Sequence, residues 1–290
     1  MGAEAQAKAD LAAALAPWAG KTIVVKFGGN AMVSEDLKRA FAEDVVTLHN
    51  AGVGVVVTHG GGPQISAALA ERGIQSEFRG GLRVTSAEAI EVVFDVLFHG
   101  VNRELASLIE QRGVSAVGMY GKTEGLFTAV RRGTVVDGVE VDLGRVGDVT
   151  AVQPAVIEAA LRTGSVPVVT SIAPDAAGDL LNVNADSAAA AVAVAVKADA
   201  LIVLTDVPGL YADWPNRDSL VPAISADALR ALLPTLESGM IPKMSACLEA
   251  VDGEVPVAII IDGREPHSVL HEVAGTGAGG TRVTLNGASE

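Results

Sequence analysis

The feature that most constrains the fold is a series of short apolar segments rich in Val and Ile, which alternate with helical stretches. Strands that are apolar on both faces are typical of a parallel sheet with helices on either side. The sequence therefore predicts an α/β fold with a mostly parallel central sheet covered on both faces. The clearest predicted strands are residues 22–27, 53–57, 166–171, 200–205 and 257–261.

Helix formers and helix stop signals divide the rest of the chain. Pro17 ends a first Ala-rich helix over residues 3–15, and Gly113 ends a long helix over residues 86–112. Turn residues inside 130–141, among them Asp137 and Gly138, predict a hairpin. Further helices are predicted at 35–50, 63–72, 154–163, 186–196, 226–233 and 243–251, and a strand at 114–119.

A turn cluster at residues 175–179 is the predicted boundary between two lobes. The length of 290 residues fits one large domain or two closely joined lobes. The predicted organisation is a helical extension over 1–20, an N-lobe over 21–175 and a C-lobe over 176–290.

Charge and composition exclude several classes of protein. A net charge of −14 argues against nucleic acid or an anionic membrane as a partner. A single cysteine excludes an internal disulfide, and the five histidines lack metal-ligand spacing, so no metal site is expected. The longest apolar run is about half of what a membrane span requires. Because the N-terminus also lacks the order of a secretion signal, we expect a cytoplasmic protein.

Glycine clusters follow several predicted strands, at Gly28–Gly29, Gly60–Gly62 and Gly80–Gly81. Backbone N–H groups in such turns, followed by a helix N-terminus, bind phosphate well. Glycine also ends strands in many α/β proteins. For each cluster taken alone, a purely structural role at the strand end therefore stays open. Neither a complete Walker motif nor a Gly-x-Gly-x-x-Gly turn after the first strand is present, so a nucleotide would be bound by other means.

Three cations stand out from their surroundings. Lys26 lies in an apolar strand, where an ammonium is costly unless an anion pairs with it, although a lysine at a sheet edge can also reach solvent. Lys243 begins a helix, where it can reach a ligand. Arg83 follows a glycine turn and suits a carboxylate ligand, or alternatively a surface ion pair.

Short polar side chains gather just before an Ala-rich helix, at Asn182, Asn184 and Asp186. Asp186 alone is explained by an N-cap, but the two asparagines favour the polar floor of a site. His59 lies beside glycines, where a general base is conceivable. A carboxylate or phosphate nucleophile needs no base, however, so we do not expect catalysis by His59.

These motifs together resemble the amino acid kinase family along nearly the whole chain. The segments at 24–30, 58–65 and 204–211 carry the resemblance, and Lys-x-Gly-Gly with a glycine turn is common to the family. Gly-Leu-Arg-Val-Thr at 81–85, Asn-Val-Asn-Ala-Asp at 182–186 and Gly-Met-Ile-Pro-Lys at 239–243 are closer to the branch that phosphorylates N-acetylglutamate.

The resemblance implies a three-layer αβα sandwich and a phosphotransferase of arginine biosynthesis. Such an enzyme transfers the γ-phosphoryl group of ATP to the side-chain carboxylate of N-acetyl-L-glutamate. Mg²⁺ would ride on the phosphates, because no carboxylate cage is evident. The N-lobe would bind acetylglutamate and form dimers, and the C-lobe would bind ATP.

Matching positions carry implied roles. Lys26 and Lys243 would neutralise the phosphates from two sides, and Asp186 would orient both lysines. Backbone amides at Gly28 and Gly29 would bind phosphate. The acetylglutamate residues would be Gly61, Gly62, Arg83 and Asn182, and the nucleotide residues Asp206, Gly209, Leu210 and Tyr211.

Both ends of the chain resemble arginine-inhibited members of the family, in which an N-terminal helix links dimers into a hexamer. The resemblance implies an L-arginine site that includes Glu272 and Gly280, a trimer of dimers, and a nitrogen-signalling PII protein as a further partner. The stretch at 274–280 departs from the usual pattern, which puts arginine feedback in doubt.

Two other functions stay open. A sibling kinase would act on a different carboxylate, such as aspartate or glutamate. A nucleotide- or amino-acid-sensing protein on the same fold would not be an enzyme, but the presence of both Lys26 and Lys243 argues against it.

Overall fold

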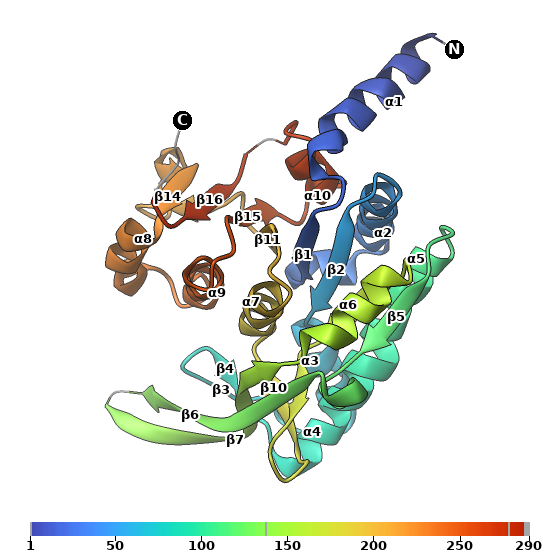
Figure 1. The fold of residues 1–290 in the computed structure, drawn as a ribbon. Coiled ribbons are helices and arrows are strands. Elements are labelled where there is room, and N and C mark those ends of the chain that lie inside the picture. Colours follow the sequence, from blue (N-terminus) through green and yellow to red (C-terminus); the bar gives the residue numbers. More distant parts are fainter. Residues whose placement is uncertain (1, 137, 278, 287–290) are drawn as a thin grey trace.

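The computed structural model describes residues 2–136, 138–277 and 279–286, and at its centre is an eight-stranded sheet (Figure 1). All neighbouring strands in it are parallel except one pair, β15 and β16. The predicted mostly parallel sheet is therefore confirmed. The strand order is β14 (Ala223–Ser225), β16 (Thr281–Thr284), β15 (Ala258–Asp262), β11 (Ala200–Thr205), β1 (Thr22–Phe27), β2 (Gly54–His59), β8 (Val166–Thr170) and β5 (Ala116–Met119).

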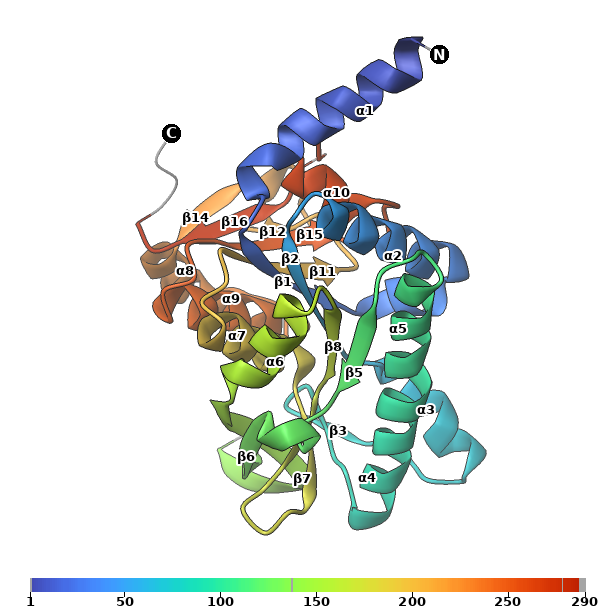
Figure 2. The same ribbon diagram turned by 45° about the vertical axis from the view of Figure 1, so that its right-hand side comes forward.

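Helices cover both faces of this sheet, as Figure 2 shows from a second direction. Because side chains alternate along a strand, Val24 and Val56 join one hydrophobic core while Val25 and Val57 join the other. The three-layer arrangement is thus confirmed. The first core is closed by α6 (Pro154–Arg162), α7 (Ala185–Ala195), α8 (Ala226–Leu232) and α9 (Ile241–Asp252), and the second by α2 (Glu35–Asn50), α5 (Arg103–Glu110) and α10 (Ser268–Val273).

A second sheet of four strands lies beyond one end of the central sheet (Figure 1). The predicted hairpin at 130–141 is confirmed and is longer than expected, although Asp137 of its predicted turn lies outside the described residues. The predicted lobe boundary at residue 175 falls in the turn between two paired strands of this sheet, and the two-lobe division stays a prediction. The strands are β6 (Phe127–Val136), β7 (Val139–Val152), β10 (Leu180–Val183) and β9 (Ile172–Pro174).

The remaining elements extend or connect these layers. The predicted N-terminal helix forms as α1 (Gly2–Leu15) and projects away from the body of the molecule (Figures 1 and 2). The predicted helix at 86–112 forms as α4 (Ala87–Phe94), a π-helical segment η3 (Asp95–Asn102) and α5. The others are α3 (Gly62–Glu71), the strand pairs β3 (Phe78–Arg79) with β4 (Leu82–Arg83) and β12 (Leu210–Tyr211) with β13 (Leu220–Val221), and the 3₁₀ turns η1 (Ala16–Trp18), η2 (Gly29–Val33), η4 (Thr123–Gly125), η5 (Arg217–Ser219) and η6 (Leu233–Thr235).

The topology brings three parallel strands and several helix N-termini to one edge of the sheet. The carboxyl ends of β11, β1 and β2 are adjacent, and α3 follows β2 directly. Helices α7 and α9 precede the parallel strands β11 and β15, so they also begin at this edge. Helix N-termini favour anions, and ligands of open α/β sheets bind outside the carboxyl ends of the strands. The functional site is therefore expected at this edge.

Candidate active site

A buried ion pair lies where β1 meets the start of α7. The Lys26 Nζ is 3.0 Å from the Asp186 Oδ1, and each residue is about 5% exposed (6% and 5%). Lys26 points to the α7 face of the sheet because it alternates with Val25, which points to the other face. The strand of Lys26 is central rather than at an edge, so its ammonium is held by an anion and does not simply reach solvent.

Asp186 is ionised between two cations. Burial by itself would raise its pKa, but the charges of Lys26 and Lys243 outweigh burial, so the pKa lies below the ordinary aspartate value. The N-cap of α7 is Asn184, whose Oδ1 accepts from the N–H groups of Asp186 and Ser187. The N-cap reading of Asp186 is therefore wrong, and its carboxylate is free to face the lysines.

Lys243 approaches the same carboxylate from the first turn of α9. Its Nζ donates to the carbonyl of Gly239 at 3.2 Å, and its side chain is only partly buried. The sequence thus places one fully buried and one partly exposed ammonium around a single carboxylate. Such an arrangement carries one net positive charge beside three helix N-termini, which favours a polyanion.

The first glycine turn leaves room around these charges. A Cβ at Gly28 would lie 2.5 Å from the Lys26 Nζ, so only glycine lets the ammonium stay in place. Gly29 has a φ of +70°, and a Cβ there would lie 2.7 Å from the Asp206 Oδ1. These two glycines therefore bring the backbone close to Lys26 on one side and to Asp206 on the other.

A cleft of about 170 Å³ adjoins the second glycine turn and contains Arg83. The Arg83 guanidinium donates to the Ser76 Oγ at 2.5 Å, to the Ser66 Oγ at 2.8 Å and to the Gly62 carbonyl at 3.1 Å. It also lies 4.7 Å from the centre of the Phe78 ring. Burial lowers the pKa of Arg83, and in this setting the fixed fork remains a cation suited to a carboxylate.

The rest of this cleft is apolar or carries uncharged polar groups, namely amides and the hydroxyl of Ser171. Asn182 lines it and donates from Nδ2 to the Thr85 Oγ1 at 3.3 Å. Leu97, Ile65 and Val183 supply apolar surface. Among the described residues that line the cleft none is acidic, so a positively charged amino group would find no carboxylate there.

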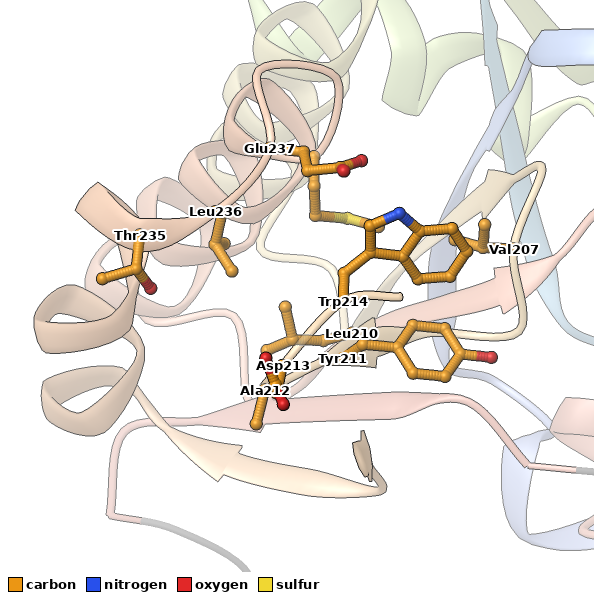
Figure 3. Close-up of a pocket in the computed structure, with 10 residues that line it drawn as sticks. Val207, Leu210, Tyr211, Ala212, Asp213, Trp214, Thr235, Leu236 and Glu237 are labelled. Carbon is orange, nitrogen blue, oxygen red and sulfur yellow. The ribbon is translucent and has the colours of Figure 1, made fainter. Parts of the chain in front are cut away.

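A second cavity of about 270 Å³ opens between β12 and the segment before α9. The Tyr211 and Trp214 rings meet edge to face with their centres 5.2 Å apart. In the view of Figure 3 the indole of Trp214 lies between the Tyr211 ring and the Glu237 side chain. Flat aromatic surface with a few polar groups at the rim suits a planar heterocycle.

The predicted nucleotide residues are divided between this cavity and its neighbourhood. Leu210 and Tyr211 line it, whereas Asp206 lies against Gly29 near the lysines. Gly209 does not line it. A Cβ at Gly209 would lie 2.6 Å from the Thr281 Oγ1, so this glycine permits close backbone packing.

Neither Glu272 nor Gly280 is among the lining residues of these clefts: Glu272 lies in α10, and Gly280 lies just before β16, where it packs against Gly209. The Glu272 carboxylate is buried and pairs with the guanidinium of Arg282 from its own chain. A Cβ at Gly280 would lie 2.3 Å from the Ile260 carbonyl oxygen, so packing alone requires glycine here. Any ligand of Glu272 would compete with Arg282.

The residues that the structure describes also bear on metal binding and on membrane insertion. They contain no cluster of three or more His, Cys, Asp or Glu side chains with the geometry to hold a metal ion. No helix within them is long and apolar enough to cross a membrane.

Comparison with known proteins identifies the family of this chain. A sequence model of the amino acid kinase family matches residues 21–262. The chain belongs to the amino acid kinase family. The acetylglutamate kinase of Arthrobacter sp. (strain FB24) is 56% identical over 290 residues, covering 97% of this chain and 94% of the relative. That of Leifsonia xyli subsp. xyli (strain CTCB07) is 59% identical over 265 residues, covering 91% and 88%.

Solved structures agree on the fold of this amino acid kinase. The N-acetylglutamate synthase of Neisseria gonorrhoeae, complexed with coenzyme A and N-acetyl-glutamate, matches with a TM-score of 0.80 at 24% identity. The match covers 95% of this chain and spans 62% of that longer chain. At this identity the likeness speaks for the fold alone, and it confirms the predicted α/β sandwich.

Sequence reasoning missed several residues of this kinase that line the aromatic cavity. They come from irregular loops and turns, which carry no periodic pattern. Trp214 was the one detectable signal, since the chain has only two tryptophans and 3% aromatic residues. The missed lining residues are Ala212, Asp213, Trp214, Thr235, Leu236, Glu237 and Met240.

Proposed function

We propose that this chain is an acetylglutamate kinase, which phosphorylates the side-chain carboxylate of N-acetyl-L-glutamate with ATP in arginine biosynthesis. The relatives support this assignment, because proteins of that name are 56% and 59% identical to it over more than nine-tenths of the chain. Membership of a kinase family supports ATP as the phosphoryl donor.

The observation that carries the choice of substrate is the charge of the Arg83 cleft. Arg83 offers a fixed guanidinium for a carboxylate, while the described lining residues include no acidic partner for an ammonium group. Free aspartate or glutamate would bury its α-ammonium without an ion pair, which is costly. An N-acetylated amino acid has a neutral amide at that position, and the apolar lining accommodates its methyl group.

In the proposed reaction a carboxylate oxygen of the substrate attacks the γ-phosphorus. The bond from phosphorus to the β,γ-bridging oxygen breaks, ADP leaves, and an acyl phosphate forms without any net proton transfer. The nucleophile is already ionised, so catalysis consists of positioning and charge neutralisation. Lys26 and Lys243 neutralise the phosphates, Asp186 holds both lysines, and the amides of Gly28, Gly29, Gly61 and Gly62 receive the phosphoryl oxygens.

The aromatic cavity is the proposed site of the adenine ring. Tyr211 and Leu210 provide flat apolar surface. Asp206 and Gly209 belong to the loop that joins this cavity to the lysine cluster, which consists of Lys26, Lys243 and Asp186. Mg²⁺ would be carried by the phosphates.

Assembly and regulation are finer proposals. We propose a cytoplasmic hexamer built from dimers, with α1 as the linking helix and dimer contacts in residues 21–175. L-Arginine would bind at Glu272 and Gly280 and would have to displace Arg282. A PII protein is a proposed partner. Sedimentation as a dimer, together with activity that millimolar arginine does not change, would contradict this part.

ATP-dependent hydroxamate formation tests the proposed function. Hydroxylamine traps an acyl phosphate as a hydroxamate, which gives a coloured complex with ferric ion, so the purified chain is incubated with MgATP, hydroxylamine and each acceptor in turn. We expect rapid formation with N-acetyl-L-glutamate and little with L-glutamate or L-aspartate. Equal or faster reaction with a free amino acid would instead identify a sibling kinase, and no reaction with any acceptor would favour a sensing protein.

A further inference from the structure

His59 is a fully buried histidine directly before the second glycine turn, and its surroundings fix both ring nitrogens. Its Nε2 lies 2.9 Å from the Nδ2 of Asn102, and its Nδ1 lies 2.9 Å from the carbonyl oxygen of Gly60. Nothing in the proposed reaction uses this side chain, because the substrate carboxylate needs no base. The two contacts therefore require another explanation.

The contacts determine which nitrogen carries the proton. The Asn102 Nδ2 also lies 2.8 Å from the Val168 carbonyl, which only accepts, so this atom is the NH₂ group of the amide. An NH₂ group donates, and the Nε2 of His59 must accept. The ring is consequently neutral with its proton on Nδ1, where it donates to Gly60. Burial lowers the pKa of His59 to about 4, against a smaller opposite effect of that hydrogen bond, which agrees with a neutral ring.

This hydrogen bond sets the direction of the next amide. The Gly60–Gly61 peptide is trans, so its carbonyl and its N–H point to opposite sides. With the Gly60 carbonyl turned inward to His59, the Gly61 N–H is turned away from the core. Gly61 lines the Arg83 cleft at the start of α3.

The π-helical segment η3 supports the same turn from behind. Leu97 and Asn102 are five residues apart, the spacing of a π-helical hydrogen bond, so their side chains lie on similar sides of η3, toward the glycine turn. A Cβ at Gly61 would lie 2.6 Å from Leu97, and a Cβ at Gly118 on β5 would lie 2.2 Å from the Asn102 Oδ1. The Asn102 amide thus sits in a space that Gly118 keeps open.

We propose that Asn102 and His59 are positioning residues that aim the Gly61 N–H at the transferred phosphoryl group. This inference rests on the proposed function, because the phosphoryl group transferred in that reaction is the ligand of the Gly61 N–H. Asn102 fixes the tautomer of His59, His59 fixes the Gly60 carbonyl, and the rigid peptide passes the orientation to Gly61. Neither side chain touches the substrate. An N–H aimed in advance stabilises developing charge without reorganisation during the reaction.

Matched variants separate this role from simple packing. We expect Asn102→Leu and His59→Leu to lower kcat about tenfold or more, with each KM within about threefold, because a misdirected donor acts mainly in the transition state. His59→Asn places an amide donor where Nδ1 stood and should restore kcat to within about threefold of the wild type. Ser165→Ala removes a partly buried hydrogen bond from the buried Ser165 to Ser115, at the other end of β8, and should leave kcat unchanged.

The tautomer is read independently by ¹⁵N NMR of the histidine rings in the wild type and in Asn102→Leu. We expect the His59 signals to show a protonated Nδ1 and a bare Nε2 in the wild type, and a mixture of tautomers in the variant. Thermal unfolding of each variant checks that it is folded at the assay temperature. If one of the leucine variants is unfolded, Gly118→Ala, which displaces the Asn102 side chain, is used in its place.

The outcomes distinguish the two claims. A wild type that forms no hydroxamate overturns the proposed function, while the tautomer still reports on the positioning pair. An active wild type whose Asn102→Leu and His59→Leu variants keep full kcat overturns the positioning role. A protonated Nε2 in the wild type overturns it as well, and so does a His59→Asn variant as slow as His59→Leu.

Discussion

The lysine cluster and the aromatic cavity differ in almost every physical respect. Lys26 and Asp186 are about 5% exposed (6% and 5%) and belong to a central strand and the first turn of a helix. Trp214 is 41% exposed and lies in a loop. Groups that stabilise charge must be rigid and shielded from water, whereas a site that admits and releases a flat ring needs only accessible surface.

This difference in burial and rigidity predicts which substitutions should slow the reaction and which should weaken substrate binding. A charge buried beside the reacting atoms acts chiefly in the transition state, and its loss should lower kcat. Aromatic contacts remote from the phosphates act equally in ground and transition states, and their loss should raise KM. Four substitutions test this distinction, and their expected effects decrease from about a thousandfold to about fivefold.

Lys26→Met should have the largest effect, a fall in kcat of about a thousandfold with little change in the KM for ATP, because it leaves phosphate charge uncompensated. Steady-state kinetics of hydroxamate formation measure it. Lys38→Met is the matched control, since Lys38 is equally buried, at 6% exposed, but pairs with Glu35 and Glu104. Equal loss of kcat in both variants would contradict the special role of Lys26.

Asp186→Asn should lower kcat about a hundredfold and destabilise the fold by about 3 kcal/mol, because two ammonium groups lose their shared anion. The pKa of Asp186 is lowered in the folded state, so the stability it contributes is present above the ordinary aspartate pKa and is lost as the pH falls below it. Urea unfolding should therefore show a gap between wild type and variant at pH 7 that narrows below about pH 4. A gap independent of pH would contradict the ion pair.

Arg83→Lys should raise the KM for N-acetyl-L-glutamate about tenfold, because a point charge replaces a fork held by Ser66 and Ser76. The KM for ATP should stay the same. Arg79→Lys, in the same hairpin but exposed and paired with Glu77, serves as the control. If both substitutions act alike, Arg83 is not the carboxylate ligand.

Trp214→Ala should give the smallest effect, a rise in the KM for ATP of about fivefold with kcat unchanged, as expected for one aromatic contact. Trp18→Ala removes the other tryptophan, which lies in η1 and contacts Lys21, and should change neither kcat nor the KM for ATP. A fall in kcat without a change in KM would show that Trp214 acts on the chemical step and would remove the contrast between the two regions.

The sequence predicted features that follow from a periodic hydrophobic pattern or from the energetic cost of burying a charge. Apolar strands and helical spacing gave the layers, and Lys26 was noticeable because an ammonium in an apolar strand has few structural explanations. The predicted strand at 53–57 ended early because Thr58 and His59 are polar, yet both are buried in β2. Asn102 escaped notice, since a π-helical register cannot be inferred from a 3.6-residue period.

The attacking oxygen is identified by ³¹P NMR of the product made from ATP and N-acetyl-L-glutamate labelled with ¹⁸O in its side-chain carboxylate. Attack by that carboxylate places an ¹⁸O atom between carbon and phosphorus, so we expect an acyl phosphate resonance with an isotope shift. An acyl phosphate signal without the shift, or ADP formation without an acyl phosphate, would contradict the account.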